Sequence, residues 1–211
     1  MQRINVDKLQ AIAKDWDAEV CVAALPGTFM FPQRPLAWIS KVPEDQAEPA
    51  LEDVACAFLV GNDRLFDEDP RFGLVVRAEI ASRALSPAVN DPGTGIDIIG
   101  RFVRLLADWA EPLAEDEEPE VEFDRVYVPA LKADDLFDDS FGPIARDGAG
   151  TLEIACRLQK ALASLSRTAP DQLGAPARAH SLRAFALAEK SLVLEQDIKA
   201  VRALAKGLEK D

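Results

Sequence analysis

The stretch Ala84-Leu85-Ser86-Pro87-Ala88-Val89-Asn90-Asp91-Pro92-Gly93-Thr94 decides how the chain is organised, because it separates two long apolar segments. It combines two prolines and a glycine with small polar residues. Each proline disfavours the helical conformation of the residue before it, so we expect Ser86 and Asp91 to be extended and the preceding helix to stop here. The sequence therefore predicts a fixed corner between two helices.

The segments on either side of this corner carry signals for helix starts. Asp69-Pro70 is an N-cap followed by a proline in the first turn, which predicts a helix from residue 70 to residue 85. Thr94 with Asp97 fits a capping box that opens the next helix, whose apolar positions run to Trp109. We therefore expect two helices that meet at the corner.

The N-terminal residues predict a small α/β unit over residues 1–42. Asn5 can cap a helix, and residues 19–25 and 35–39 have the alternating, β-branched pattern of strands joined by a turn at Pro26-Gly27. This pattern is typical of a β-hairpin or half-barrel. The polar connector Val42-Pro43-Glu44-Asp45 then leads into the rest of the chain.

Residues 43–211 predict a mainly helical region that forms one compact domain with the first unit. One strand is expected near residues 121–128, and it can pair with the N-terminal unit. The other expectations are a helix through Val54 and Phe58, a helix from Ala133 that Gly142-Pro143 kinks or splits, a helix from Leu152, a loop over residues 170–176, and two final helices. The fold class is thus α+β: a small β-containing unit followed by an α-helical bundle.

Composition excludes several classes of partner and compartment. The net charge of −13 repels phosphate backbones, so nucleic acid is excluded, and acidic runs such as residues 115–118 are interpreted as solvated loops. No apolar run is long enough for a membrane span, and the N-terminus does not have the pattern of a signal peptide. The cysteines Cys21, Cys56 and Cys156 are interpreted as small buried hydrophobes in a reducing compartment.

The sequence offers no catalytic or metal signature. The chain has one histidine, His180, which we place on a helix surface, and a nucleophilic triad or a zinc site lacks its other members. No catalytic residue, metal ligand or cofactor is therefore predicted. Candidates for ligand or interface contacts are the polar residues at and near the corner, which also suit caps and turns: Asp67, Asp69, Arg71, Arg83, Ser86, Asn90, Asp91 and Thr94.

These features together resemble the soluble C-terminal part of a bacterial family, domain of unknown function 2254, whose members are predicted membrane proteins. The resemblance rests on Pro26-Gly27, Pro35-Leu36-Ala37, residues 69–73 and, most specifically, residues 83–92 with Thr94. It implies a parent protein in the cell membrane, attached through N-terminal helices absent from this chain. The cytoplasmic side is a separate expectation for the soluble part, and the sequence alone does not decide the side. The family brings no catalytic residues, so none is assigned.

The favoured hypothesis is a non-enzymatic assembly or ligand-sensing domain that forms a homo-oligomer. One alternative is a hydrolase that uses a divalent cation held by Asp67, Asp69 and Asp91. Another is a vestibule ring of a channel-like or transporter-like assembly, which predicts a closed cyclic oligomer.

Overall fold

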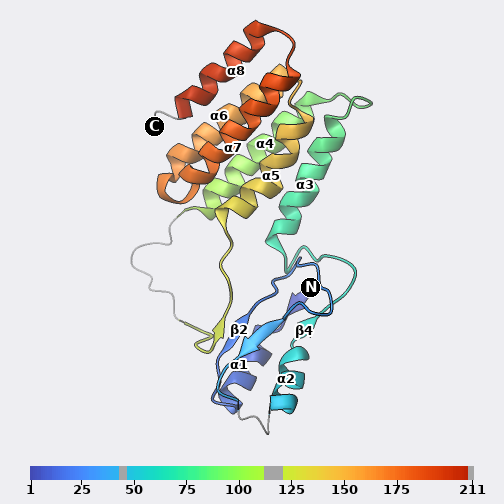
Figure 1. Cartoon of the computed structure of the whole chain (residues 1–211), viewed down its shortest axis with the longest axis vertical. Helices are drawn as coiled ribbons and strands as arrows, with labels where there is room; N and C mark the ends of the chain where they lie inside the picture. Colours follow the sequence, from blue (N-terminus) through green and yellow to red (C-terminus); the bar gives the residue numbers. More distant parts are fainter. Residues whose placement is uncertain (43–46, 112–120, 209–211) are drawn as a thin grey trace. The chain divides into compact units, whose positions relative to one another are not determined.

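A computed structural model describes residues 1–42, 47–111 and 121–208 (Figure 1). The chain divides into two compact units, one made of residues 1–72 and 115–130 and the other of residues 73–114 and 131–211. The connector at residues 43–45 and the acidic run at residues 115–118 lie outside the described residues. The first unit thus extends past residue 42, and whether the chain folds as one domain stays a prediction.

In its described residues, the first unit contains two short sheets and the helices α1 (Val6–Asp15) and α2 (Ala47–Ala55). The strands are β1 (Arg3–Ile4), β2 (Val20–Val22), β3 (Ala37–Ile39), β4 (Phe58–Leu59) and β5 (Val126–Tyr127). One sheet pairs β1 with β4, and the other has the order β3-β2-β5. In the second sheet β2 is antiparallel to β3 and parallel to β5.

Local signals explain the start of this unit. The Asn5 side chain accepts a hydrogen bond from the Lys8 amide at 2.9 Å, which confirms the predicted cap of α1. Leu9, Ile12 and Ala13 are buried at helical spacing, so the apolar face of α1 forms part of the core of this unit. The pairing of β5 with β2 confirms that the strand near residues 121–128 joins the N-terminal unit.

One prediction in this unit is wrong. Phe58 does not continue a helix with Val54, because α2 ends at Ala55 and Phe58 begins the strand β4. The register pairs Ile4 with Phe58, and Phe58 is buried in the core of the unit. Pairing with β1 therefore overrides the helical spacing of the two apolar residues.

The second unit is a helical bundle. Its helices are α3 (Pro70–Ala84, whose first residues belong to the first unit), α4 (Pro92–Trp109), α5 (Ala133–Asp147), α6 (Leu152–Thr168), α7 (Pro170–Ser191) and α8 (Glu195–Leu208). Helix α6 packs against α4, α7 and α8, and α5 packs against α7. At the centre, the ring of Phe141 lies edge-on to Phe102 at 5.7 Å and to Phe137 at 5.4 Å between ring centroids.

Two prolines lie inside helices that the sequence predicted to be interrupted. Gly142-Pro143 does not split α5, and the predicted loop at residues 170–176 is instead the first part of α7, with Pro170 in its first turn and Pro176 in its interior. Buried residues flank both interior prolines, Phe141 and Ile144 in α5 and Leu173 and Ala177 in α7. Core packing on both sides holds each helix together, although each proline removes one backbone hydrogen bond.

The architecture confirms the α+β class, with a small β-containing unit followed by a helical bundle. The predicted corner is also confirmed, since α3 ends at Ala84 and α4 begins at Pro92. This corner and the start of α3 hold the predicted candidate residues.

Candidate functional site

The start of α3 is built around a buried carboxylate. Asp69 is only 1% exposed; its Oδ1 accepts from the Phe72 amide at 3.1 Å and its Oδ2 accepts from Arg64 Nε at 2.7 Å. The Arg64 guanidinium also lies 5.0 Å from the centre of the Phe72 ring. Asp69 is therefore the predicted N-cap of α3, held in place by an arginine.

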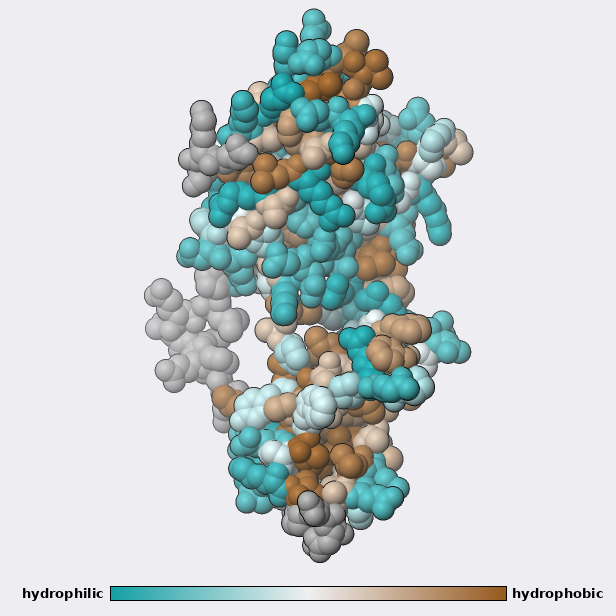
Figure 2. Space-filling model, viewed as in Figure 1, coloured by the Kyte–Doolittle hydropathy of each residue, from teal (hydrophilic) through white to brown (hydrophobic). Residues whose placement is uncertain are grey.

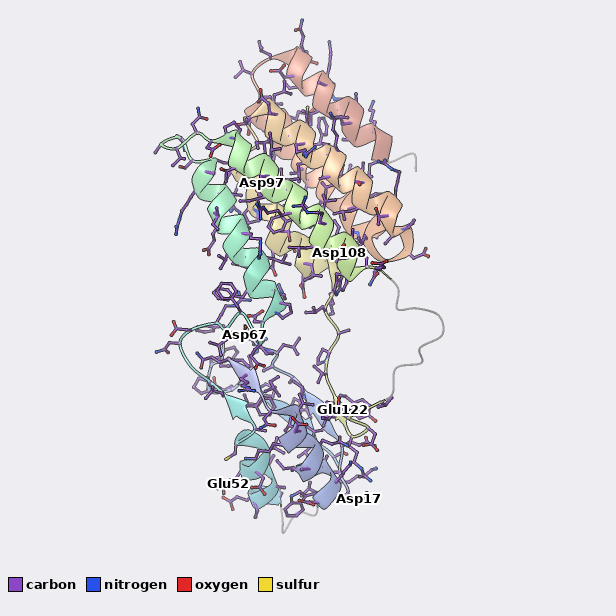
Figure 3. All side chains as sticks on the ribbon, turned by 180° about the vertical axis from the view of Figure 1, so that it is seen from behind. Asp17, Glu52, Asp67, Asp97, Asp108 and Glu122 are labelled. Atoms are coloured by element: carbon purple, nitrogen blue, oxygen red, sulfur yellow. The ribbon has the colours of Figure 1, made fainter. Side chains whose placement is uncertain are left out.

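Gly27 completes this arrangement. Its φ of 84° lies in the left-handed region, and a Cβ on this residue would collide with the Asp69 carboxylate. The Pro26-Gly27 turn and the α3 cap are therefore packed against each other within the first unit. Asp67 is exposed (Figure 3), and Arg71 is half-buried in the first turn of α3.

The corner between α3 and α4 uses its polar groups locally. Asp91 is the N-cap of α4: its carboxylate accepts from the Thr94 amide at 3.1 Å and from Thr94 Oγ1 at 2.6 Å. These hydrogen bonds from Thr94 hold the pKa of Asp91 below its usual value. The predicted capping box of Thr94 with Asp97 is thus wrong: Asp91 precedes Pro92 and caps first, and Asp97 pairs with Arg101 at 2.7 Å.

The remaining corner residues close the turn. Asn90 has a φ of 51°, a conformation that asparagine tolerates well, and its amide donates to the Ser86 carbonyl at 2.8 Å. Ser86 Oγ donates to the Arg83 carbonyl at 2.7 Å, and the Arg83 side chain is exposed. These residues therefore act as turn formers, as expected, and a ligand or subunit contact at the corner stays a prediction.

The structure offers no support for a carboxylate centre made of Asp67, Asp69 and Asp91. The first two precede α3, and Asp91 follows it after a helix of 15 residues, a rise of about 22 Å at 1.5 Å per residue. Among the residues that the structure describes, no three His, Cys, Asp or Glu side chains are grouped so that they could hold a metal ion. Nothing here favours the hydrolase or the vestibule ring.

A second feature, which the sequence interpretation missed, is a row of side chains across the three-stranded sheet. The register places Cys21 opposite Trp38 on β3 and opposite Tyr127 on β5. All three are exposed, Trp38 to 65% and Tyr127 to 53%. We call Trp38, Cys21 and Tyr127 the aromatic row. On β2, Val20 and Val22 on either side of Cys21 point into the core.

This row corrects the interpretation of the cysteines. Cys21 and Cys56 are exposed and Cys156 is partly exposed, so the prediction of buried thiols is wrong for the first two. The alternation in residues 20–22 could have revealed the position of Cys21, since both valines face inward and the residue between them must face outward.

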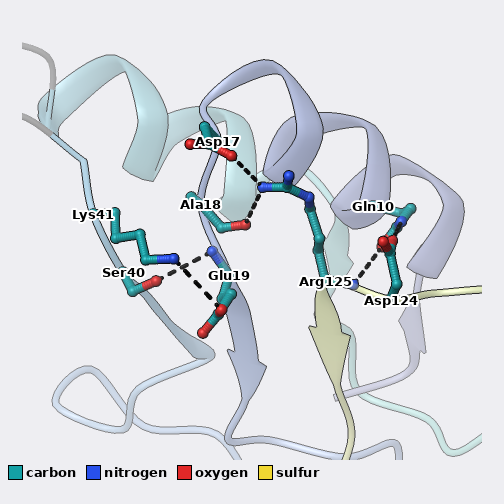
Figure 4. A network of polar contacts seen from close by, with 8 residues as sticks. All are labelled: Gln10, Asp17, Ala18, Glu19, Ser40, Lys41, Asp124 and Arg125. Carbon is teal, nitrogen blue, oxygen red and sulfur yellow. Dashed lines mark hydrogen bonds and ion pairs between the residues drawn. The ribbon is translucent and has the colours of Figure 1, made fainter.

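A polar row borders the aromatic row. It consists of Arg125, Glu19 and Ser40, which lie next to the ends of β5, β2 and β3, two residues from Tyr127, Cys21 and Trp38. Figure 4 shows the contacts of this polar row: Arg125 Nη1 donates to Asp17 at 2.7 Å, and Lys41 Nζ lies 3.6 Å from Glu19.

The same contacts attach β5 to the start of the chain. Arg125 holds the pKa of Asp17 below its usual value, through a hydrogen bond and charge attraction. The Arg125 amide donates to Gln10 Oε1 at 3.1 Å, and Gln10 Nε2 donates to Asp124 and lowers the pKa of that carboxyl. Residues 124–127 therefore have a fixed place beside α1 and β2 despite their distance in sequence.

In the helical bundle, His180 lies in a place that the sequence interpretation did not foresee. The predicted surface histidine is 8% exposed, with its ring centre 5.7 Å from that of Phe137 and Nε2 3.5 Å from Asp138 Oδ1. Burial lowers the pKa of His180. The ring is part of the contact between α5 and α7, through Phe137 and Asp138.

Comparisons with known proteins identify the family. Residues 1–164 match the family model described as "Predicted membrane protein (DUF2254)". Relatives include the uncharacterized proteins Mb1321c of Mycobacterium bovis and Rv1290c of Mycobacterium tuberculosis, each 50% identical over 40 residues. These residues are 19% of this chain and only 8% of each relative's length. No solved structure matches the chain.

The search for membrane spans gives one further finding. None of the helices in the described part of the chain is both long and apolar enough to cross a bilayer. The family match covers more than half of the chain and includes the Asp69-Pro70 helix start, the corner and the strands that carry the aromatic row. The chain therefore belongs to the DUF2254 family of predicted membrane proteins.

Proposed function

We propose that this chain is a non-enzymatic assembly module of a bacterial membrane protein, through which two copies associate. The aromatic row of Trp38, Cys21 and Tyr127 carries the proposal. Trp and Tyr are enriched in the buried centres of protein interfaces, and the row itself holds no charged side chain. Figure 2 shows hydrophobic side chains (brown) at the surface of both units on the face that it draws; its hydropathy colouring does not mark Trp and Tyr, so the exposure of the row follows from the fractions above.

A second copy of the chain is the partner that fits this face with the fewest assumptions. Two sheets can pack face to face at a separation of about 10 Å, with side chains interdigitating between them. A two-fold axis over Cys21 would place the row of one copy against the same row of its partner, so that a single surface serves both. The polar row beside it would then form the rim of the contact.

The same proposal places the module on the cytoplasmic side of the membrane, attached through segments outside this chain. The support is the family description together with the free, exposed thiols of Cys21 and Cys56. Exposed free thiols persist in a reducing compartment and are oxidised outside it. The membrane attachment follows the description of the family as predicted membrane proteins.

Cysteine cross-linking of the whole chain tests the association. In a variant that keeps only Cys21 (Cys56→Ser, Cys156→Ser), a short bismaleimide reagent is expected to give a covalent dimer. The matched control keeps only Cys56, which is also exposed but lines a groove of about 260 Å³ beside β1 and β4, outside the aromatic row. The Cys56-only variant still carries Trp38 and Tyr127 and should associate, but it is expected to give no covalent dimer, because Cys56 lies outside the aromatic row.

A further variant links the cross-link to the aromatic side chains. Adding Trp38→Ser and Tyr127→Ser to the Cys21-only chain is expected to abolish the dimer while circular dichroism stays unchanged, since both side chains are exposed. Equal cross-linking of the Cys21-only and Cys56-only variants, or a monomeric mass by light scattering at all concentrations, would overturn the proposal.

A further inference from the structure

The groove between α4 and α6 in the helical bundle is lined by basic side chains and, among the residues that the structure describes, by no carboxylate. It has a volume of about 280 Å³ and is lined by aliphatic side chains together with Gly100 and Arg104 of α4 and Arg157, Lys160 and Ser164 of α6. Three cations and a hydroxyl thus surround one concavity. From this arrangement we infer that the α4–α6 groove binds a phosphate-bearing anion.

The helical spacing explains why these groups gather. Arg157, Lys160 and Ser164 are spaced by three and four residues, so they lie along one side of α6. Helix α4 packs against α6 and brings Arg104 to the same groove. Gly100 leaves room here: a Cβ at this position would lie 4.0 Å from Arg157 Nη2, so the guanidinium lies close over the α4 backbone.

The cations of the groove have no ion-pair partner in the part of the chain that the structure describes. Within the described residues, no ion pair joins Arg104, Arg157 or Lys160 to a carboxylate, whereas Arg101 pairs with Asp97 and Arg202 with Glu189, each at 2.7 Å. Asp97 and Asp108 lie on α4 (Figure 3), but neither lines the groove. Gathering three unpaired cations costs free energy through repulsion, and a bound anion would remove that cost.

The donor set indicates a phosphoryl group as the anion. A guanidinium offers paired N–H donors that match two phosphate oxygens, a lysine adds a compact positive charge, and a serine hydroxyl donates one further hydrogen bond. The volume is near the lower end of small-ligand sites, about 300 Å³, and leaves space for a small organic part beside the phosphate. The same chemistry fits a free phosphomonoester or the headgroup of an anionic lipid.

Titration of the whole chain at low ionic strength tests the inference, since salt screens such contacts. One arm uses inorganic phosphate and glycerol phosphate in calorimetry; the other uses flotation with vesicles of phosphatidylcholine alone or mixed with phosphatidic acid. Saturable binding in the first arm identifies a free ligand. Binding only to the phosphatidic acid vesicles identifies a lipid headgroup.

Three variants separate a specific site from general charge attraction. Arg157→Gln with Lys160→Gln is expected to weaken binding by about 10-fold or more in whichever arm is positive. The matched control, Lys190→Gln with Lys199→Gln, removes the same charge from exposed positions on α7 and α8 and should change binding by less than about two-fold. Gly100→Leu keeps every charge but fills the groove, and it should also weaken binding.

Two outcomes would overturn the inference. One is the absence of binding in both arms by a chain whose circular dichroism shows it to be folded. The other is an equal loss of binding in Arg157→Gln with Lys160→Gln and in the control Lys190→Gln with Lys199→Gln, together with unchanged binding by Gly100→Leu. This result would show that only net charge matters. The cross-linking of Cys21 is measured separately, so neither result decides the other proposal.

Discussion

His180 shows how the position of one residue changes its chemistry. Its ring lies in the contact between α5 and α7, with Phe137 and Asp138 facing it from α5. Burial favours the neutral ring, and Arg183 acts in the same direction, while Asp138 and Asp134 favour the charged form. Burial is the largest influence, so the folded state binds a proton less readily than the unfolded chain.

This lowered pKa makes a prediction for stability against pH. Above the unfolded pKa of about 6.5, His180 is neutral in both states and has no effect. As the pH falls below that value, the unfolded chain takes up the proton first, so the free energy of unfolding should decrease until the lower folded pKa is passed. Urea unfolding followed by circular dichroism at several pH values between about 7.5 and 5 measures the decrease.

The matched comparison for this prediction is His180→Gln, which keeps a neutral polar side chain at the site. Its free energy of unfolding should decrease less than that of the natural chain over the same pH range. If both proteins lose the same amount, the carboxylates that titrate at lower pH account for the change, and His180 does not.

At the scale of the helix, the corner between α3 and α4 depends on one carboxylate. Asp91 accepts two hydrogen bonds from Thr94 and satisfies the first turn of α4, so Asp91→Ala should lower the melting temperature by a few degrees. Asp91→Asn is the matched control, because asparagine caps as well as aspartate but carries no charge. A thermal scan of the natural chain, Asp91→Ala and Asp91→Asn measures the effect of losing the cap and the effect of losing the charge alone.

The same pair of variants also tests whether the corner does more than cap. If it contacts another subunit, Asp91→Ala should lower the mass measured by light scattering in addition to the melting temperature. A change in melting temperature alone would show that the corner acts only inside the fold. The absence of any change would contradict the cap itself.

Local signals predicted the helix and strand starts well, and tertiary packing explains the failures. Asn5, Asp69-Pro70 and the 84–92 corner act through neighbouring backbone groups, so their roles follow from sequence. Pro143 and Pro176 break a local rule, but buried residues around them keep α5 and α7 continuous. Phe58 pairs with Ile4, which lies more than fifty residues earlier, and no local pattern contains that partner.

The candidate site was predictable only in part for the same reason. The caps at Asp69 and Asp91 follow from local sequence, whereas the aromatic row needs the pairing of β5 with β2, over a hundred residues apart. The α4–α6 groove likewise combines Arg104 of α4 with Arg157 and Lys160 of α6. This combination requires the packing of α4 on α6. Sites assembled by long-range contacts are therefore the part that sequence patterns did not reveal.

At the scale of the whole chain, the negative charge is distributed very unevenly. Residues 1–72 and 115–130 contain 20 acidic and 8 basic residues, whereas residues 73–114 and 131–211 contain 17 acidic and 16 basic residues. Nearly all of the net charge of −13 thus belongs to the unit that carries the aromatic row. Two copies that meet through this row must bring like charges together.

This distribution predicts how the proposed association responds to salt. Raising the sodium chloride concentration from about 50 mM to about 500 mM shortens the Debye length from more than 10 Å to less than 5 Å and screens the repulsion between two acidic units. The dimer fraction of the natural chain, measured by sedimentation velocity, should therefore rise with salt, because contacts among Trp38, Cys21 and Tyr127 involve no charge pairs. Trp38→Ser should stay monomeric throughout, whereas the control Val193→Ser, at a position that is 93% exposed in the helical bundle, should behave as the natural chain does. A dimer that weakens as salt rises would instead show that ion pairs hold it together, and the aromatic row would then not be the contact.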